Sequence, residues 1–139
     1  MSAEARRAVS TGAAPPPAGP YSQAVVVGKL VFLAGQTPRE PGGCRLLMEP
    51  LHVQVRQTLD NLDAVAAAAG GSLRDAVKIN IFVRPGVDMA IVNEIYREYV
   101  ADPLPARTTT VSELPGGAIE IDAILHLGTA RASGKGAFR

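Results

Sequence analysis

Two charged residues, Arg107 and Glu120, lie in β-prone runs and have side chains suited to work on a small carboxylic acid. A planar guanidinium can hold a carboxylate through two parallel hydrogen bonds. A carboxylate can hydrogen-bond a water molecule and accept its proton. In the run 119–127 apolar and other residues alternate, so Glu120 projects from the face opposite the isoleucines and meets solvent, a ligand or another subunit. A surface ion pair for Arg107 and a solvated Glu120 are the alternatives.

No motif supports a catalytic or metal-binding role for the other reactive side chains. Cys44 lies in a loop with no base beside it, which favours a bystander role. His52 and His126 have no paired acid–base spacing, and His and Cys are too scarce and scattered for a metal site. Ser22 lacks the glycine pattern of a nucleophile elbow. The predicted domain has no basic stripe and few aromatic side chains, so RNA cleavage has little support.

Composition predicts one compact domain with an aliphatic core. The 139 residues are 47% hydrophobic and only 4% aromatic. With 14 basic and 13 acidic residues, the net charge of +1 does not point to nucleic acid or an anionic membrane. The single cysteine fits a reducing compartment, so we expect a cytoplasmic protein. No apolar stretch approaches the roughly 18 residues that span a bilayer.

Both ends of the chain have compositions typical of loose segments. Residues 1–17 are small, polar and proline-rich, and Arg6-Arg7 is not followed by the apolar run of an export signal. Residues 129–139 carry three basic side chains among Gly, Ala and Ser. We therefore predict flexible tails at 1–17 and 129–139 around a domain at 18–128.

The period of the hydrophobic pattern predicts two helices and five strands. Gly28-Lys29 suits a tight hairpin turn, Pro50 and Gly70-Gly71 bound the first helix, and Asp88 is a candidate N-cap of the second. In chain order the predicted elements are strands 24–27 and 30–34, helix 50–69, strand 77–83, helix 89–100, and strands 107–110 and 119–127.

The helical stripes and strand alternation also predict which side chains are buried. Helix 50–69 should bury its valines and leucines and turn Gln54 and Asn61 outward. Strand 77–83 should place Val77 on its aliphatic face. On the second helix, Tyr96 belongs to the buried stripe, and Asn93 beside it is either solvated or directed toward a site.

This order of elements predicts an α+β domain with two helices on one face of a mixed sheet. The hairpin is apolar at nearly every position, so its second face needs a cover that one chain does not supply. Further along, that face includes Lys78, Asn80, Glu120 and Asp122. Such a surface is typical of a subunit interface with polar pockets at its margins, which a cyclic oligomer would close.

From about residue 17 to 127 the chain resembles the RidA family, also called the YjgF or reactive intermediate deaminase family. Six fragments carry the resemblance, in the same order and at compatible spacing. They are Gly19-Pro20-Tyr21-Ser22-Gln23-Ala24, Ala34-Gly35-Gln36, Gln54-x-Arg56-Gln57-Thr58-Leu59-x-Asn61-Leu62, Asn93-Glu94-x-Tyr96, Pro105-Ala106-Arg107-Thr108 and Ile119-Glu120-Ile121.

The resemblance implies a homotrimer with a chorismate-mutase-like fold and a site in each cleft between subunits. It also implies cofactor-free hydrolysis of 2-enamines and 2-imines, such as 2-aminoacrylate, to 2-oxo acids and ammonia. Arg107 falls on the arginine that holds the substrate carboxylate, and Glu120 falls on the glutamate that positions water. Tyr21 and Asn93 fall on cleft-lining residues, and with Thr109 we expect them to contact substrate.

One position departs from many enzymatic members of the family, because Thr109 stands where they carry a cysteine. If the family uses this position mainly through its backbone, threonine changes little. If the thiol itself contacts substrate, the activity or the substrate preference shifts. A larger enamine such as 2-aminomuconate is a further candidate substrate. The competing hypothesis is a non-catalytic trimer that binds small carboxylates or a protein client. Family members have also been called endoribonucleases and translation inhibitors.

Overall fold

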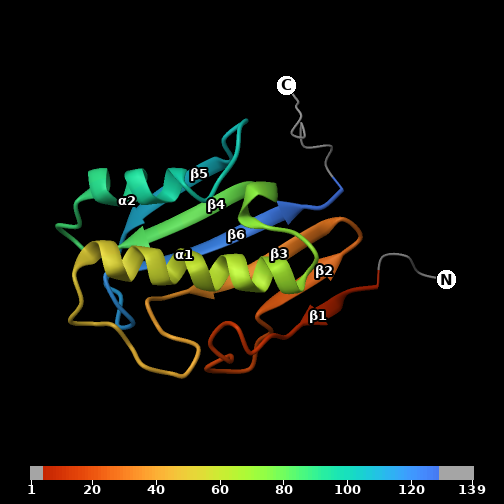
Figure 1. Cartoon of the computed structure of the whole chain (residues 1–139), viewed down its shortest axis with the longest axis horizontal. Helices are drawn as coiled ribbons and strands as arrows, with labels where there is room; N and C mark the ends of the chain where they lie inside the picture. Colours follow the sequence, from red (N-terminus) through yellow and green to blue (C-terminus); the bar gives the residue numbers. More distant parts are fainter. Residues whose placement is uncertain (1–4, 129–139) are drawn as a thin grey trace.

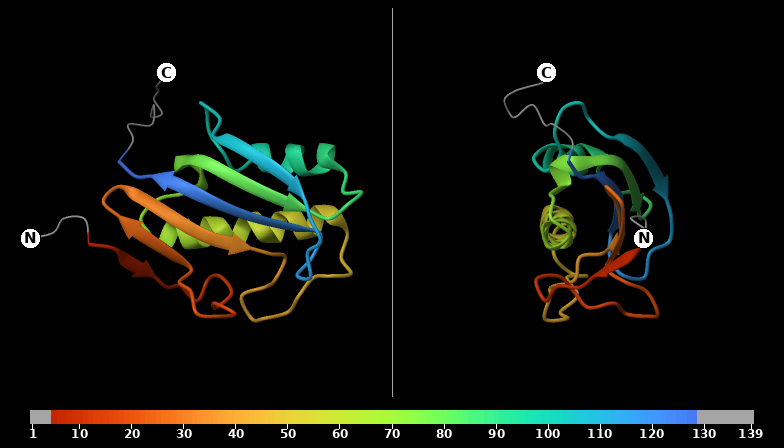
Figure 2. Two further views of the ribbon diagram at one scale, coloured as in Figure 1. Left: turned by 180° about the vertical axis from the view of Figure 1, so that it is seen from behind. Right: turned by 90° about the vertical axis from the view of Figure 1, so that its right-hand side faces the viewer.

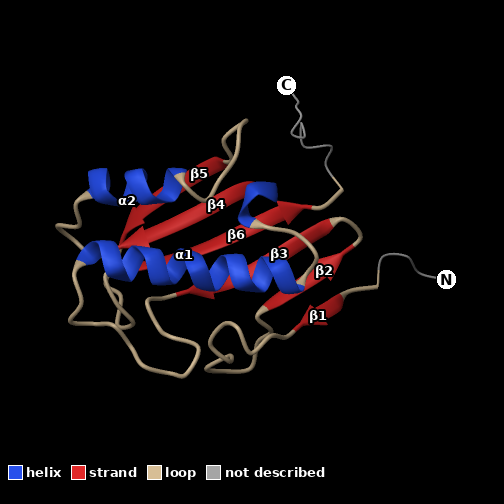
Figure 3. Ribbon diagram, viewed as in Figure 1, coloured by secondary structure: helices blue, strands red, loops and turns tan. Residues whose placement is uncertain are grey.

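The computed structural model describes residues 5–128 as a mixed sheet with α1 and α2 on one face (Figures 1 and 3). The strand order is β1-β2-β3-β6-β4-β5, and only the pair β4 and β5 is parallel. The predicted α+β class is confirmed, and the predicted tail at 129–139 lies outside the described residues. The elements are β1 (Arg7–Val9), β2 (Ala24–Val27), β3 (Leu30–Gln36), α1 (Leu51–Ala68), the 3-10 helix η1 (Leu73–Asp75), β4 (Ala76–Val83), α2 (Met89–Arg97), β5 (Ala106–Val111) and β6 (Ile119–His126).

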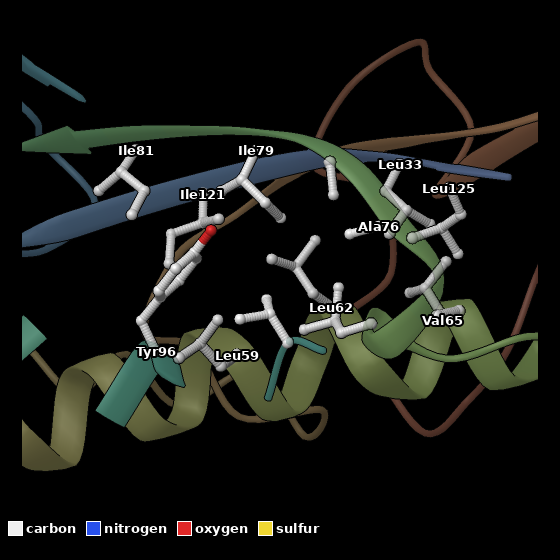
Figure 4. Packing of buried hydrophobic residues seen from close by; sticks show 14 of the residues in the cluster. Leu33, Leu59, Leu62, Val65, Ala76, Ile79, Ile81, Tyr96, Ile121 and Leu125 are labelled. Carbon is white, nitrogen blue, oxygen red and sulfur yellow. The ribbon is translucent and has the colours of Figure 1, made fainter. Parts of the chain in front are cut away.

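The core lies between the helices and the sheet, and it is aliphatic as the composition predicts. Seen from the side, both helices lie on one side of the curved sheet (Figure 2). Figure 4 shows the facing side chains, with Tyr96 of α2 reaching across to the strands. The fully buried members include Leu59, Leu62 and Val65 of α1, Ile79 and Ile81 of β4, and Ile119, Ile121 and Leu125 of β6. Burying these aliphatic side chains is the main force that holds the layers together.

Helix α1 matches its predicted bounds within one residue at each end. Pro50 precedes it, and Gly70 follows with a φ of +96°, a conformation that glycine adopts without strain. For α2, the Asp88 side chain accepts a hydrogen bond from the Ala90 N–H, as predicted, but the helix ends at Arg97, three residues before the expected end. Within residues 5–128, neither helix is long and apolar enough to cross a bilayer.

Two side chains of α1 that we expected on its outer face, Gln54 and Asn61, are buried. Gln54 Nε2 donates to the carbonyl of Glu49 at 2.9 Å, and Gln54 Oε1 accepts from the Ala118 N–H at 2.9 Å. Asn61 Nδ2 donates to the carbonyl of Arg39 at 2.7 Å. Both amides therefore tie irregular loops to the helix, because buried backbone groups without a strand partner need another one.

Residues 5–17 of the predicted loose leader are held against the sheet, and residues 1–4 lie outside the described residues. β1 pairs with β2, and the buried side chain of Gln23 holds the segment between them. Its Oε1 accepts from the Thr11 N–H at 2.7 Å, and its Nε2 donates to the carbonyls of Thr11 at 3.0 Å and Pro15 at 2.9 Å. These partners lie 8 to 12 residues away in sequence, so local composition does not reveal them.

Strand β4 departs from simple alternation at its first residues. Its pairing with β6 shifts between Ala76 and Lys78, so Ala76 is buried and Val77 is 47% exposed. The expectation that Val77 lies on the aliphatic face is therefore wrong. An extra residue in one strand of an antiparallel pair reverses the facing of side chains beyond it. From Ile79 onward the predicted alternation holds.

The sheet face away from the helices is open in the single chain. Leu30 and Phe32 of β3 are 38% and 43% exposed there, while Asn80 Nδ2 donates to Asp122 Oδ1 at 2.8 Å further across the face. This is the mixture of apolar hairpin and polar strands that the sequence predicts. At the far edge, all residues of β5 are exposed.

We predict that Gln23→Ala destabilises the fold by about 1–3 kcal/mol, because it leaves several backbone groups of the preceding segment without their partner. Urea unfolding at a fixed protein concentration measures the change, and hydrogen exchange should rise in residues 7–15. His52→Ala, on the exposed side of α1, is the control and should stay within about 0.5 kcal/mol. Equal effects of the two substitutions would contradict the role of Gln23.

Candidate active site

Glu120 lies at the start of β6 on the face opposite the core. Its neighbours Ile119 and Ile121 are fully buried, so strand alternation directs Glu120 away from them, as predicted. The half-buried carboxyl lines a cavity of about 430 Å³. Burial, and to a lesser degree the Asp122 carboxylate, raises the pKa of Glu120 above its usual range. A carboxylate with a raised pKa is a better proton acceptor near neutral pH.

The wall of this cavity comes from segments far apart in sequence. Tyr21 lines it, and the Tyr21 hydroxyl accepts a hydrogen bond from the Ala18 N–H at 3.1 Å. The loop after β3 and the turn before β6 add further lining, including Arg39, Arg45 and Gly116. Tyr21 and Glu120 thus line the same cavity, and their roles in catalysis stay a prediction. The structure also adds two arginines that our sequence analysis did not single out.

Gly35 lies directly against the Glu120 carboxyl group. A Cβ atom at this position would collide with Glu120 Oε2 and lie 3.2 Å from the carboxyl carbon. The absence of a side chain therefore lets the carboxylate rest against the β3 backbone. Gly35 belongs to the fragment 34–36 used for the resemblance, but only the structure gives the reason for a glycine there.

Arg107 lies on the edge strand β5 and is oriented by α2. Its Nη1 donates to Asn93 Oδ1 at 2.8 Å, and its guanidinium carbon lies 5.1 Å from the centre of the Tyr96 ring. Stacking over an aromatic face and a hydrogen bond to a neutral amide orient the cation without neutralising it. Asn93 therefore contacts Arg107 directly, and its place in a substrate site stays a prediction. Tyr96 has a role beyond the core that the helical stripe alone does not indicate.

Thr109 is exposed on β5, two residues after Arg107, where a regular strand places both side chains on one face. No hydrogen bond of its hydroxyl is among those found within residues 5–128. Contact between Thr109 and substrate stays a prediction.

Within one chain, Arg107 and Glu120 do not share a cavity. The cavity beside Glu120 is lined by the N-terminal segment, the loop after β3 and the turn before β6, and not by β5. Arg107 instead faces α2 at the outer edge of the sheet. One chain therefore carries two separate clusters, one with Tyr21 and Glu120 and the other with Asn93 and Arg107.

The other candidate groups gain no support from the structure. Cys44 and His52 are exposed on the loop and on α1. In the part of the chain that the structure describes, no three His, Cys, Asp or Glu side chains are grouped to hold a metal ion. The predicted chemistry within the described residues is thus divided between the cavity, with Tyr21 and Glu120, and the Arg107 cluster at the edge of the sheet.

The family model for endoribonuclease L-PSP matches residues 11–127. The chain belongs to this family, the RidA family. A RidA-family relative from Dermatophagoides farinae, named 2-iminobutanoate/2-iminopropanoate deaminase, is 40% identical over 122 residues, which cover 86% of this chain and 95% of the relative. A protein of the same name from Capra hircus is 36% identical, covering 89% of this chain and 92% of its own.

Solved structures of RidA-family proteins share the fold. RidA from an Antarctic Psychrobacter species has a TM-score of 0.81 at 39% identity, covering 87% of this chain and 99% of that one. Escherichia coli TdcF with bound serine has a TM-score of 0.78 at 33% identity, covering 86% and 98%. The family and the fold that the sequence predicts are therefore confirmed.

For this RidA-family chain we predict that Gly35→Ala displaces the Glu120 carboxylate at a small cost in stability. The colliding atom is the far end of a flexible side chain, so the cost should be about 1 kcal/mol. A carbon-detected NMR titration of Glu120 should show its pKa moving down toward the ordinary value, because the displaced group gains solvent. Gly42→Ala, with open space around its Cα, is the control. An unchanged Glu120 titration would contradict the contact.

Proposed function

We propose that this chain is a cofactor-independent imine deaminase of the 2-iminobutanoate/2-iminopropanoate type. It would hydrolyse 2-enamines and 2-imines such as 2-aminoacrylate to 2-oxo acids and ammonia. The relatives named as such deaminases support the reaction type. Two clusters carry the proposal. One holds a guanidinium at the edge of the sheet that has no carboxylate partner within residues 5–128, and the other holds a carboxylate in a cavity.

The site is completed by a second copy, in which Arg107 of one protomer faces the cavity of its neighbour. The open sheet face supports this assembly, because Leu30 and Phe32 leave apolar surface exposed. A cyclic arrangement repeats one contact around an axis, and we propose a homotrimer with one site at each seam. Arg107 and Glu120, separated within a chain, then act on the same substrate.

Arg107 holds the substrate carboxylate. One of its nitrogens is already bonded to Asn93, so other N–H groups remain for a carboxylate. The Tyr96 ring limits the directions in which the guanidinium can turn. Orientation is most of the catalytic task, because an imine carbon is already electrophilic and needs only a water molecule held at one face. Thr109, on the same face of β5, contributes to the substrate wall.

Glu120 supplies the proton transfers. As water attacks the imine carbon, the carboxylate accepts a proton from it and then returns a proton to nitrogen. The hydroxyl of the resulting carbinolamine gives its proton to the same carboxylate, which passes it to nitrogen, so that the C–N bond breaks, the oxygen becomes the carbonyl of the 2-oxo acid, and the nitrogen leaves as ammonia. An enamine first takes up a proton at carbon and loses one from nitrogen to reach the imine. Tyr21, on the same cavity wall, limits the space above the reacting atoms.

We expect Arg107→Ala to lower kcat/KM for 2-iminopropanoate by about 100-fold or more, since it removes charge-assisted hydrogen bonds to the substrate. Glu120→Gln should lower kcat by about 10²–10⁴-fold, the range of general-base catalysis. Imine generated in place from serine by a dehydratase is followed as ammonia and 2-oxo acid. Arg97→Ala, exposed on α2, is the matched control.

Carboxylate binding without acceleration by the wild-type chain would favour the binding module instead. RNA degradation that is insensitive to Arg107→Ala would point to an unrelated activity.

Mixing inactive variants tests whether the site is shared between copies. When Arg107→Ala and Glu120→Gln chains are unfolded and refolded together in equal amounts, random assembly gives each seam both native residues about a quarter of the time. We therefore expect recovery of about a quarter of wild-type activity from the mixture and none from either variant alone. No recovery, although mass measurements show mixed assemblies, would place both residues in one chain's site.

A further inference from the structure

The cavity beside Glu120 contains two arginines that the proposed deamination does not use. Arg39 and Arg45 lie on the loop between β3 and α1, and their backbones form an antiparallel bridge. Both line the same cavity as Glu120. Residues opposite each other in an antiparallel bridge have neighbouring side chains. The two arginines therefore lie next to each other on the wall of one cavity.

This pair of positive charges has no counter-ion within residues 5–128. The ion pair found there joins Arg56 to Glu98, and neither Arg39 nor Arg45 takes part in one. For Arg39 the side-chain hydrogen bond that the structure shows is a long one, from Nη1 to the Pro16 carbonyl at 3.4 Å. Like charges placed opposite each other destabilise a strand pair. A bound anion would relieve that repulsion and satisfy the free donors.

The loop that carries the arginines is anchored to α1 and closed on itself. Asn61 Nδ2 donates to the Arg39 carbonyl at 2.7 Å, and the Glu40 N–H donates to the Cys44 carbonyl at 2.8 Å. The Leu46 N–H donates to the Pro38 carbonyl at 2.8 Å. Holding the backbone before a ligand arrives reduces the ordering cost of binding. The two guanidinium groups are thus presented by a preorganised loop.

The position of the pair suits the far end of a substrate. Glu120 lines the cavity but forms no ion pair with either arginine, so the carboxylate and the cations occupy different parts of it. A volume of about 430 Å³ falls within the range of small-ligand pockets, roughly 300–1,000 Å³. Space therefore remains for a side chain beyond the carbon that water attacks.

We propose that Arg39 and Arg45 form a second anion subsite that selects 2-imino acids carrying a carboxylate on their side chain. The inference rests on the proposed deaminase function and names its substrate class. Arg107 of the neighbouring copy would hold the carboxylate next to the imine, and Arg39 with Arg45 would hold the distal one. The preferred substrate is then a 2-imino dicarboxylic acid.

The test compares two imines of equal chain length. An amino-acid oxidase generates 2-iminoglutarate from glutamate and 2-iminopentanoate from norvaline, and semicarbazide capture of the remaining imine measures hydrolysis. The wild-type chain should show the higher kcat/KM for the dianionic imine. Arg39→Gln and Arg45→Gln should each lower the ratio of the two kcat/KM values by about tenfold, as expected for a lost hydrogen bond to a charged group.

Arg74→Gln is the matched control, because it also removes one exposed positive charge but lies on η1. It should leave the ratio of the two kcat/KM values unchanged. A ratio insensitive to both cavity substitutions, or equally sensitive to Arg74→Gln, would overturn the subsite while leaving the deaminase function intact.

A binding measurement separates failure of the subsite from failure of the enzyme. Calorimetry with the full chain should show 2-oxoglutarate binding more tightly than 2-oxopentanoate, with the difference lost in the Arg39→Gln/Arg45→Gln variant. If no imine is hydrolysed but this difference holds, the deaminase proposal falls and the anion subsite stands. Equal affinity of wild-type protein for the two acids would overturn the subsite by a readout that needs no turnover.

Discussion

The burial of β6 is the constraint on which the rest of the structure depends. This strand lies between β3 and β4, and every second residue from Ile119 to Leu125 packs against the helices. A shift of one residue would turn those side chains outward and expose the aliphatic surface to water, so the register is strongly held. The same register directs Glu120 away from the core. The position of the carboxylate is therefore a consequence of core packing.

Polar side chains of α1 fix the positions of the neighbouring loops. A helix on a sheet needs apolar residues on its inner stripe, yet α1 buries Gln54 and Asn61 at its margin. Their side-chain amides form hydrogen bonds with loop carbonyls and with one loop N–H, in place of water. Breaking any of these hydrogen bonds would leave a buried polar group without a partner. Loops held in this way keep a defined shape although they have no strand partners. The cavity wall beside Glu120 is built from such loops.

Sequence reasoning succeeded where period and local chemistry decide the outcome. The bounds of α1, the Asp88 cap and the facing of Glu120 all follow from patterns within about one turn or a few strand residues. It failed where the partner is distant, as with Gln23 holding residues before β2, or where a bulge breaks alternation, as at Val77.

The separation of Arg107 from Glu120 could not be read from the sequence either, because it depends on which strand edges each residue occupies. Arg39 and Arg45 lie in a proline- and glycine-rich loop, where no periodicity indicates that they converge.

The outer edge of the sheet has a consequence for solubility. β5 is the last strand in the order and is exposed along its whole length, ending at Val111, which is 64% exposed. Its threonines and valine favour extended backbone, so an unprotected edge of this kind invites a foreign strand to add to it and begin aggregation. A charge near the beginning of the strand opposes such addition. Arg107 places such a charge at this edge of the single chain, before a second copy covers it.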